Sequence, residues 1–356
     1  MKIEISGKEL KSVLSRVGVA VSPRPSMPIL GHVCIEPMAD GLVMHATNLD
    51  ISVSIQAEAK MQGDGSLLLP LDRLQRCAGG DLVTIEQQAK AAKVSTGNFW
   101  HVLPRLVDEK MPVNRLPKGE GVLRVAASDL ISALESVLVS CAGNDLQPAL
   151  PGVHFKAGGG ELLYVATDGK RAAFRRFAVD GELPCFTLPR ASVDALMRAA
   201  PFGEVEITAD STAVRFDWED GELSSRLIES TYPNVLQIRQ SILHYSPDWA
   251  VVDVAAMKVA VDRVSTINAG NRISLEVAGG KLRVAGATGD SSEIAEDMCD
   301  ATGPDIPVAF CNGVFVSQAL ASCPFDTARI SMGTFVGVAN PDGDDWICAI
   351  APLRNK

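Results

Sequence analysis

The clearest pair of chemically active side chains lies in the segment Ala166-Thr167-Asp168-Gly169-Lys170-Arg171. Asp168 and Lys170 have the residue types of an acid–base pair. The segment, however, lies between the apolar runs 162–165 and 172–174, and Asp-Gly is typical of a turn that needs a positive φ. We therefore interpret it as a hairpin turn with a local ion pair, and not as a catalytic site.

Other catalytic patterns are equally weak. The triple glycine 158–160 lacks the Lys and Ser/Thr of a phosphate-binding loop, and the five histidines are scattered, with no H-E-x-x-H motif. No nucleophile elbow is present. The eight cysteines form no C-x-x-C pair, and the even spacing of Cys299, Cys311 and Cys323 is not a metal-ligand spacing. We expect reduced thiols, no metal, no cofactor and no enzymatic activity.

Composition limits the partners that the chain can bind. At 356 residues, with 47% hydrophobic residues, it is long enough for two or three globular domains. Its formal charge of −10 would repel nucleic acid, so any binding to DNA requires a segregated basic face. The N-terminus lacks the apolar region of a signal peptide, and no apolar run reaches the length of a membrane helix. These features predict a cytoplasmic protein without membrane contact.

The elements around the Asp168 turn occur three times. Segments similar to 166–170 begin at Ala46 and Gly286, each after an apolar run. The spacing of about 120 residues is too long for a solenoid repeat and is typical of a whole domain. Each repeat begins with a strand and an amphipathic helix, expected at 7–20, 129–140 and 255–267. A second strand and helix follow about 60 residues later, with those helices at 71–78, 190–200 and 313–323.

Alternating strands separated by polar turns fill the rest of each repeat. This order predicts an α+β fold in which helices lie on one side of antiparallel sheets. We expect three repeated domains, each with two helices, at 1–119, 120–245 and 246–356.

On this threefold framework the chain resembles the bacterial DNA polymerase III beta subunit, the sliding clamp, over essentially its whole length. The resemblance rests on five short segments in matching order: Arg24-Pro25-Ser26-Met27-Pro28-Ile29-Leu30, the Asp168 turn, Leu188-Pro189-Arg190, Tyr232-Pro233-Asn234 and Ala351-Pro352-Leu353-Arg354. It implies a non-catalytic processivity factor in DNA replication. Two such subunits form a ring around duplex DNA and tether the replicative polymerase and other partners.

The resemblance also implies a DNA-binding surface on the helices that line the ring. Its expected residues are Lys8, Lys11, Arg16, Arg24, Arg73, Arg76, Asn144, Arg190 and Arg198. The lining is only weakly basic, and Asp129 and Glu135 make the helix at 129–140 acidic. Phosphate contacts carry no sequence information, so weak ones permit sliding. A solvated surface role is the alternative for each cation.

A second implied site is a cleft between the second and third domains, where the polymerase and the clamp loader dock short linear peptides. Its expected residues are Leu150, Thr167, Lys170, Arg171, Ala172, Pro233, Ile238, Phe315, Ala349, Ile350, Ala351, Pro352, Leu353 and Arg354. Apolar residues would form the walls, and Arg171 and Arg354 would hold polar groups of the peptide. The family has bulkier residues at Ala349 and Ala351, and Asn355-Lys356 extends its usual end. Ordinary interdomain packing is the alternative.

The third implied site closes a homodimer. An odd number of domains leaves one open sheet edge at each end of the chain, and head-to-tail pairing of two chains covers both. The resemblance places one edge near Phe99, Trp100 and His101, and the other near Thr266, Ile267 and Asn271. Alternatively, Phe99 and Trp100 face the core.

Two other functions remain open at the level of the sequence. The weakly basic helices and the extended tail also suit an accessory or mobile-element clamp that serves a different polymerase. A hydrolase or ligand-binding protein that reuses the fold is the alternative of another class.

Overall fold

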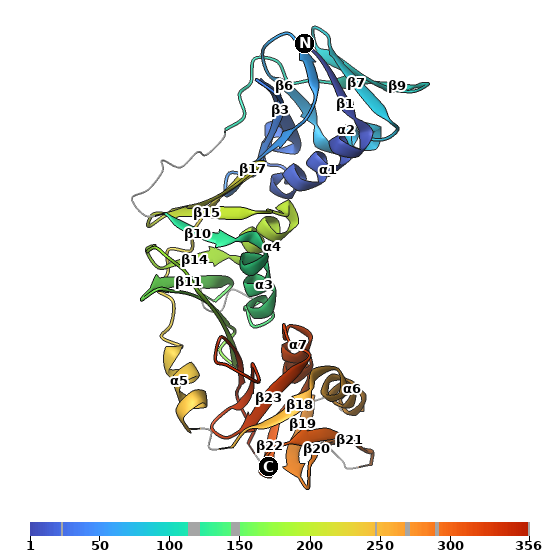
Figure 1. Ribbon diagram of the computed structural model, residues 1–356. Helices are drawn as coiled ribbons and strands as arrows, with labels where there is room; N and C mark the ends of the chain where they lie inside the picture. The colour runs from blue at the N-terminus through green and yellow to red at the C-terminus, as the bar shows by residue number, and fades with distance from the viewer. Residues whose placement is uncertain are drawn as a thin grey trace. The chain divides into compact units, whose positions relative to one another are not determined.

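The computed structural model describes residues 1–22, 24–112, 122–143, 150–245, 248–267, 271–288 and 292–354 (Figure 1). It divides into two compact units. Unit 1 comprises Met1–Ser128, Gly181–Pro184 and Ala191–Leu227, and unit 2 comprises Asp129–Asp180, Cys185–Arg190 and Ile228–Lys356. Each unit is described by itself below.

Unit 1 contains two antiparallel sheets. The five-stranded sheet has the order β5 (Lys60–Gln62), β1 (Lys2–Ser6), β7 (Leu82–Gln87), β8 (Ala91–Thr96) and β9 (Phe99–Pro104). The eight-stranded sheet has the order β10 (Leu123–Ala126), β15 (Glu204–Ala209), β16 (Ala213–Trp218), β17 (Gly221–Arg226), β4 (Ile51–Ala57), β3 (Gly41–Thr47), β2 (His32–Met38) and β6 (Leu67–Pro70). In this second sheet β17 pairs with β4, so strands far apart in the sequence share one ladder.

The first helix of unit 1 shows why the predicted periodicity works. Helix α1 (Gly7–Val17) begins where the Ser6 hydroxyl accepts a hydrogen bond from the Glu9 amide at 3.1 Å. Its buried residues Leu10, Val13, Leu14 and Val17 recur at helical spacing. The helix packs on β3 and β4 and beside α2 (Leu71–Cys77). The short 3₁₀ helices Gly18–Ala20 and Pro28–Gly31 follow α1, and α4 (Arg190–Ala199) belongs almost wholly to this unit.

Unit 2 is built on one twelve-stranded antiparallel sheet. Its order is β14 (Phe186–Pro189), β11 (Gly152–Gly158), β12 (Glu161–Thr167), β13 (Arg171–Ala178), β25 (Trp346–Ile350), β24 (Val336–Ala339), β23 (Thr327–Met332), β18 (Ala250–Asp253), β21 (Ile294–Thr302), β20 (Lys281–Ala287), β19 (Arg272–Ala278) and β22 (Ile306–Asn312). Its helices are α3 (Ala127–Leu138, from Asp129 onward), α5 (Leu236–Tyr245), α6 (Val254–Ser265) and α7 (Gly313–Ala321), with α6 beside α7 (Figure 1).

The α+β prediction is confirmed, and all six expected helices are present within a few residues. The Asp168 segment is a hairpin turn between β12 and β13, with Gly169 at φ 82°. Its ion pair joins Asp168 to Arg171 at 3.0 Å, whereas Lys170 contributes only its backbone amide to Asp168. Helix α5 was not expected, because it directly precedes a predicted domain boundary.

One edge-capping contact occurs three times in the fold. The amides of Leu106, Ile228 and Leu353 donate to the carbonyls of Leu68, Thr187 and Phe310, at 3.3, 3.0 and 2.7 Å. The three acceptors lie on the edge strands β6, β14 and β22. Each lies two residues before the end of its strand, where helix α2, α4 or α7 begins. Each donor follows β9, β17 or β25 by two or three residues. The chain therefore covers each of these strand edges with its own departing segment.

All eight cysteines are free in the structure, and only Cys185 is exposed. In the described ranges, no three His, Cys, Asp or Glu side chains lie close enough together to hold a metal ion. None of the helices described above has both the length and the apolar character needed to cross a membrane.

Candidate functional sites

An apolar pocket of about 150 Å³ lies in unit 2. Nine of the fourteen residues expected in the peptide cleft line it: Leu150, Thr167, Lys170, Arg171, Ala172, Pro233, Ile238, Ala349 and Ala351. Gly169, Val235 and Phe335 complete the wall and were not expected. Val235 follows the Tyr232-Pro233-Asn234 motif closely enough to be inferred from it, but no local pattern marks Phe335.

Strand pairing explains why these residues meet. Ala172 on β13 lies opposite Ala349 on β25, and the Ala351 amide extends the pairing by donating to the Lys170 carbonyl at 2.9 Å. The short side chains leave space above the sheet. Val235 and Ala349 belong to one buried apolar cluster, and Ile238 and Phe335 pack against it. The pocket is therefore shaped to accept an apolar side chain.

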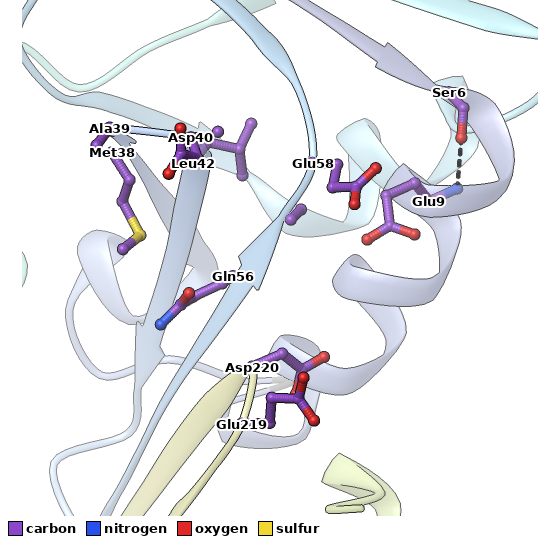
Figure 2. Close-up of a pocket in the computed structure, with 12 residues that line it drawn as sticks. Ser6, Glu9, Met38, Ala39, Asp40, Leu42, Gln56, Glu58, Glu219 and Asp220 are labelled. Atoms are coloured by element: carbon purple, nitrogen blue, oxygen red, sulfur yellow. Dashed lines mark hydrogen bonds between the residues drawn. The ribbon is translucent and has the colours of Figure 1, made fainter.

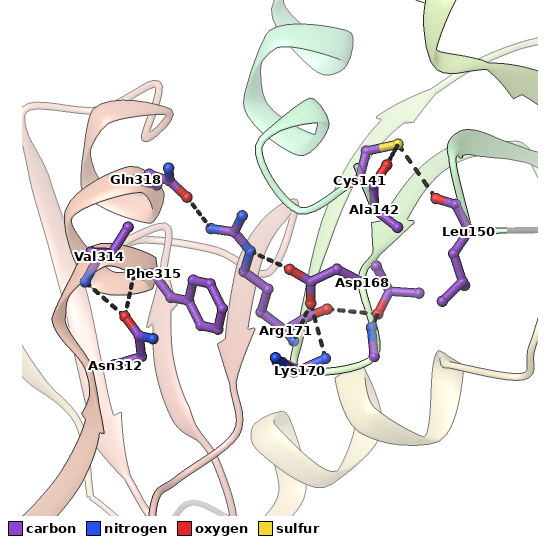
Figure 3. A network of polar contacts seen from close by, with 12 residues as sticks. Cys141, Ala142, Leu150, Asp168, Lys170, Arg171, Asn312, Val314, Phe315 and Gln318 are labelled. Carbon is purple, nitrogen blue, oxygen red and sulfur yellow. Dashed lines mark hydrogen bonds and ion pairs between the residues drawn. The ribbon is translucent and has the colours of Figure 1, made fainter. Parts of the chain in front are cut away.

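The structure places Arg171 inside a polar network, not free at the rim (Figure 3). Its guanidinium pairs with Asp168 at 3.0 Å, donates to the Gln318 side chain at 2.6 Å and stacks over the Phe315 ring at 4.4 Å. Its side chain is only 8% exposed. Arg171 and Phe315 thus attach the hairpin turn to α7, and of the two only Arg171 lines the pocket.

The end of the described chain lies beside the pocket but does not line it. Ile350 is fully buried, whereas Pro352, Leu353 and Arg354 are exposed. The Leu353 amide donates to Phe310, and Arg272 donates to the Arg354 carbonyl at 2.8 Å. The tail is therefore tied to β22. Asn355 and Lys356 lie outside the described residues.

Unit 1 carries most of the expected DNA-binding cations. Lys8, Lys11, Arg24, Arg73, Arg76 and Arg198 are all exposed, and they come from α1, α2, α4 and the loop after α1. Two contacts join these helices: Gln75 of α2 donates to the Leu14 carbonyl at 3.2 Å, and Arg16 of α1 donates to the Ala199 carbonyl at 2.8 Å. A hollow of about 430 Å³ includes Arg198 and residues of both α1 and α2.

Arg16 differs from this exposed group. Its two terminal nitrogens bind the Asp220 carboxylate at 2.5 and 2.7 Å, and the Trp218 indole donates to the same carboxylate at 2.7 Å. With Nε bonded to Ala199, all three nitrogens of Arg16 are used within the protein. We therefore remove Arg16 from the candidate DNA surface. Arg190 is half-buried and belongs to unit 2, and Asn144 lies outside the described residues.

Helix α1 places Lys8 and Lys11 on a different face from Glu9. Lys8 and Lys11 lie three residues apart on an exposed stripe, whereas Glu9 and Arg16 lie seven apart on another. Glu9 faces a hollow of about 720 Å³ whose other carboxylates are Asp40, Glu58, Glu219 and Asp220 (Figure 2). Five carboxylates of unit 1 thus surround one hollow that neither Lys8 nor Lys11 lines, so this acidic cluster is segregated from the two lysines.

Two strand edges carry exposed apolar residues. Strand β9 ends its sheet, and Phe99, Trp100 and Val102 are 49%, 64% and 40% exposed. Phe99 and Trp100 therefore do not face the core of this chain. On β21 the residues from Ile294 to Asp300 pair with β20 on one side, while β18 pairs only with Ala301 and Thr302.

The β21 edge also carries exposed apolar side chains. Ile294 and Met298 are 73% and 52% exposed. Sequence reasoning missed both, because they share the exposed face of the strand with the charged residues Glu296 and Asp300. Of the residues that were expected near this edge, Thr266 is exposed and Ile267 and Asn271 are partly exposed.

Comparison with solved structures defines the class of protein. The fold matches the sliding clamp from Pseudomonas aeruginosa bound to griselimycin with a TM-score of 0.91, and that from Bacillus subtilis with 0.88, each over 100% of both chains at 20% identity. A clamp from Bartonella birtlesii, also bound to griselimycin, matches at 0.88 and 22% identity over 100% of both chains. The chain has the fold of a DNA sliding clamp.

Sequence comparison then gives the family. Models of the N-terminal and central domains of the DNA polymerase III beta subunit match residues 1–107 and 124–234. The beta sliding clamp of Synechococcus elongatus is 28% identical over 353 residues, covering 94% of this chain and 93% of its own length. The chain belongs to the DNA polymerase III beta subunit family and is a DNA sliding clamp, a non-catalytic processivity factor. The family and the function predicted from the sequence are confirmed, and no comparison favours an accessory clamp.

Proposed function

We propose that two copies of this chain close head to tail into a ring that encircles duplex DNA and presents one peptide-docking cleft per subunit to the polymerase and the clamp loader. Each subunit contributes three clamp domains, at 1–119, 120–245 and 246–356. Like its relatives, the ring would act on DNA in the bacterial cytoplasm.

The main support for the ring is that, among the described residues, β9 and the 294–300 segment of β21 each have an unpaired strand edge with exposed apolar residues. Exposed edges of this kind are normally protected or paired. Antiparallel pairing of β9 with the 294–300 segment of a second chain would bury Trp100 against Ile294 or Met298. Lys93, whose ammonium lies 5.9 Å from the centre of the Trp100 ring, would face the acidic residues of β21. The same pairing at the opposite ends of the two chains closes the assembly at two subunits.

The exposed cations of unit 1 support loose DNA contact. They are Lys and Arg side chains at exposed positions, and the phosphate contacts that such side chains make are salt-dependent and independent of sequence. Retention on DNA would therefore depend on encirclement, since a weakly basic surface alone releases DNA at moderate salt.

The pocket in unit 2 supports peptide docking. Its volume of about 150 Å³ suits one large apolar side chain, and its wall combines aliphatic, proline and aromatic residues. We propose that griselimycin, which is bound in the structures of two related clamps, occupies this pocket here as well. Ala172→Trp would fill the pocket from β13 and should abolish griselimycin binding in calorimetry, because Ala172 is 1% exposed and lines its wall.

Sizing followed by retention on DNA tests the ring. The purified chain should scatter light as a dimer at micromolar concentration, and after loading it should stay on circular DNA at salt that removes it from linear DNA. Cutting the circle should release it. A monomer at these concentrations, or equal loss from both DNA forms, would contradict the ring.

A further inference from the structure

The loop at residues 340–345, between β24 and β25, is held by arginines from three other elements. From β13, Arg175 pairs with Asp345 at 2.5 Å. From β23, Arg329 donates to the Gly343 carbonyl at 2.6 Å. Such charge-assisted contacts are the stronger hydrogen bonds of proteins. The loop is therefore fixed to the sheet more firmly than a surface turn requires.

Asp344 is the centre of this arrangement. Its carboxylate pairs with Arg176 of β13 and, at 3.0 Å, with Arg239 of α5. Arg239 also donates to the Asp344 backbone carbonyl at 2.9 Å, and Arg176 pairs in addition with Glu161 at 2.5 Å. The Arg239 and Arg176 side chains are 18% and 27% exposed and that of Asp344 is 40% exposed, so these pairs are partly screened by solvent.

The elements joined by Asp344 are those that form the apolar pocket. Ile238, which lines the pocket from α5, immediately precedes Arg239. Ala172 lines it from β13, the strand that carries Arg176, and Ala349 lines it from β25, which begins two residues after Asp344. Through Arg176 and Arg239, the Asp344 carboxylate therefore joins β13 and α5 to the loop that leads into β25.

We propose that Asp344 is a positioning residue for the cleft: it holds α5 at a fixed distance from β13 and β25 and so sets the width of the pocket. The proposal rests on the peptide-docking function proposed above. Asp344 does not line the pocket and acts only through Arg239 and Arg176.

Removing the charge leaves α5 attached by apolar packing and by the bond from Arg239 to the Asp344 backbone carbonyl. Ile238 and Ile242 contact the buried cluster beneath the helix, but they do not fix how far the 233–238 segment stands from the sheet. The segment then samples positions in which the pocket is too wide or too narrow. Apparent affinity falls in proportion to the fraction of molecules with the correct width, so we expect binding to weaken roughly three- to tenfold.

The test measures griselimycin binding by calorimetry to the full-length protein and its Asp344→Asn variant. Asp342→Asn is the matched control, because it removes one carboxylate from the same loop at an exposed position. Asp344→Glu retains the charge and should bind within about twofold of the unmodified protein, a rescue that a role in filling space would not produce. Arg239→Gln removes only the ion pair between α5 and Asp344 and should reproduce the loss of griselimycin affinity. This variant also keeps the test decisive if Asp344→Asn fails to fold.

Amide hydrogen exchange supplies the second measurement. In Asp344→Asn the amides of α5 should exchange faster, while those of β13 and β25 keep their protection, because the change loosens one helix and not the sheet. Normal binding and normal α5 exchange in Asp344→Asn would overturn the proposal, as would equal weakening by Asp342→Asn. If the unmodified protein fails to bind griselimycin, the cleft assignment is wrong, whereas exchange of the α5 amides still tests whether Asp344 positions the helix; the two failures are therefore distinguishable.

Discussion

Replacing Arg16 with Ala decides whether this arginine belongs to the DNA surface or to the internal structure of unit 1. The change removes a bidentate pair at 2.5 and 2.7 Å and the bond from Nε to the Ala199 carbonyl. It leaves the Asp220 carboxylate, with a side chain that is 27% exposed, bonded to the Trp218 indole. We expect Arg16→Ala to destabilise the protein.

The magnitude follows from burial. Hydrogen bonds to charged groups contribute about 1.5–3 kcal/mol each, and breaking a fully buried pair costs about 3–5 kcal/mol. The Arg16 side chain is 14% exposed, so the pair is mostly but not completely buried. We expect the free energy of unfolding to fall by about 3 kcal/mol, measured by urea denaturation and read at the transition that involves unit 1.

Lys11→Ala is the matched control, because it removes the same charge from an exposed position on the same helix. A surface change of this kind should alter the free energy of unfolding by less than about 0.5 kcal/mol. A double-mutant cycle with Asp220→Ala should give a coupling energy of about 1.5 kcal/mol or more. If Arg16→Ala and Lys11→Ala are equally stable, Arg16 is a free surface cation and the structural argument is wrong.

Three further predictions concern acid stability, the ring and DNA. Burial, with Lys156 nearby, lowers the pKa of His154 to about 4. The unfolded chain therefore binds a proton at His154 more readily than the folded protein does, and the free energy of unfolding should decrease as the pH falls from about 6.5 toward 4. In urea denaturation, His154→Phe, which keeps a ring against Tyr232, should lose about 1 kcal/mol less than the unmodified protein between pH 7 and pH 5. Trp100→Glu should give monomers in light scattering, because it places a carboxylate opposite the acidic β21 edge. Lys8→Glu should reduce direct DNA binding at low salt and leave griselimycin affinity unchanged, since Lys8 lies in the other unit.

The sequence predicts the fold well where the pattern is local. Apolar spacing identifies α1 from Leu10, Val13, Leu14 and Val17, because a helix that packs on a sheet must bury one face. The Asp-Gly turn is equally local. Helix α5 was missed because tertiary contacts stabilise it: Ile238 and Ile242 pack on the sheet and Arg239 pairs with Asp344. Such contacts join residues about a hundred positions apart, and no window of sequence contains them.

The sites show the same division. The resemblance places Ala172, Pro233 and Ala349 together, and the structure brings them to one pocket. The resemblance does not reveal that the donors of Arg171 are directed to Asp168 and Gln318, or that Arg16 binds Asp220. A cation in a sequence looks the same whether it faces solvent or a carboxylate. Its role depends on the partner that the fold places beside it.

The exposure of Trp100 has a spectroscopic consequence. Of the four tryptophans, Trp346 is fully buried, Trp218 is 7% exposed and Trp249 is partly exposed, whereas Trp100 is 64% exposed. The indole at the β9 edge therefore emits from an aqueous environment in a separate subunit and from an apolar one when the edge is covered. The pairing proposed above would therefore change the emission of the chain and give an optical signal of dimer formation. With Trp218 replaced by Phe to lower the background, opening and closing of a ring could be followed in real time without an attached dye.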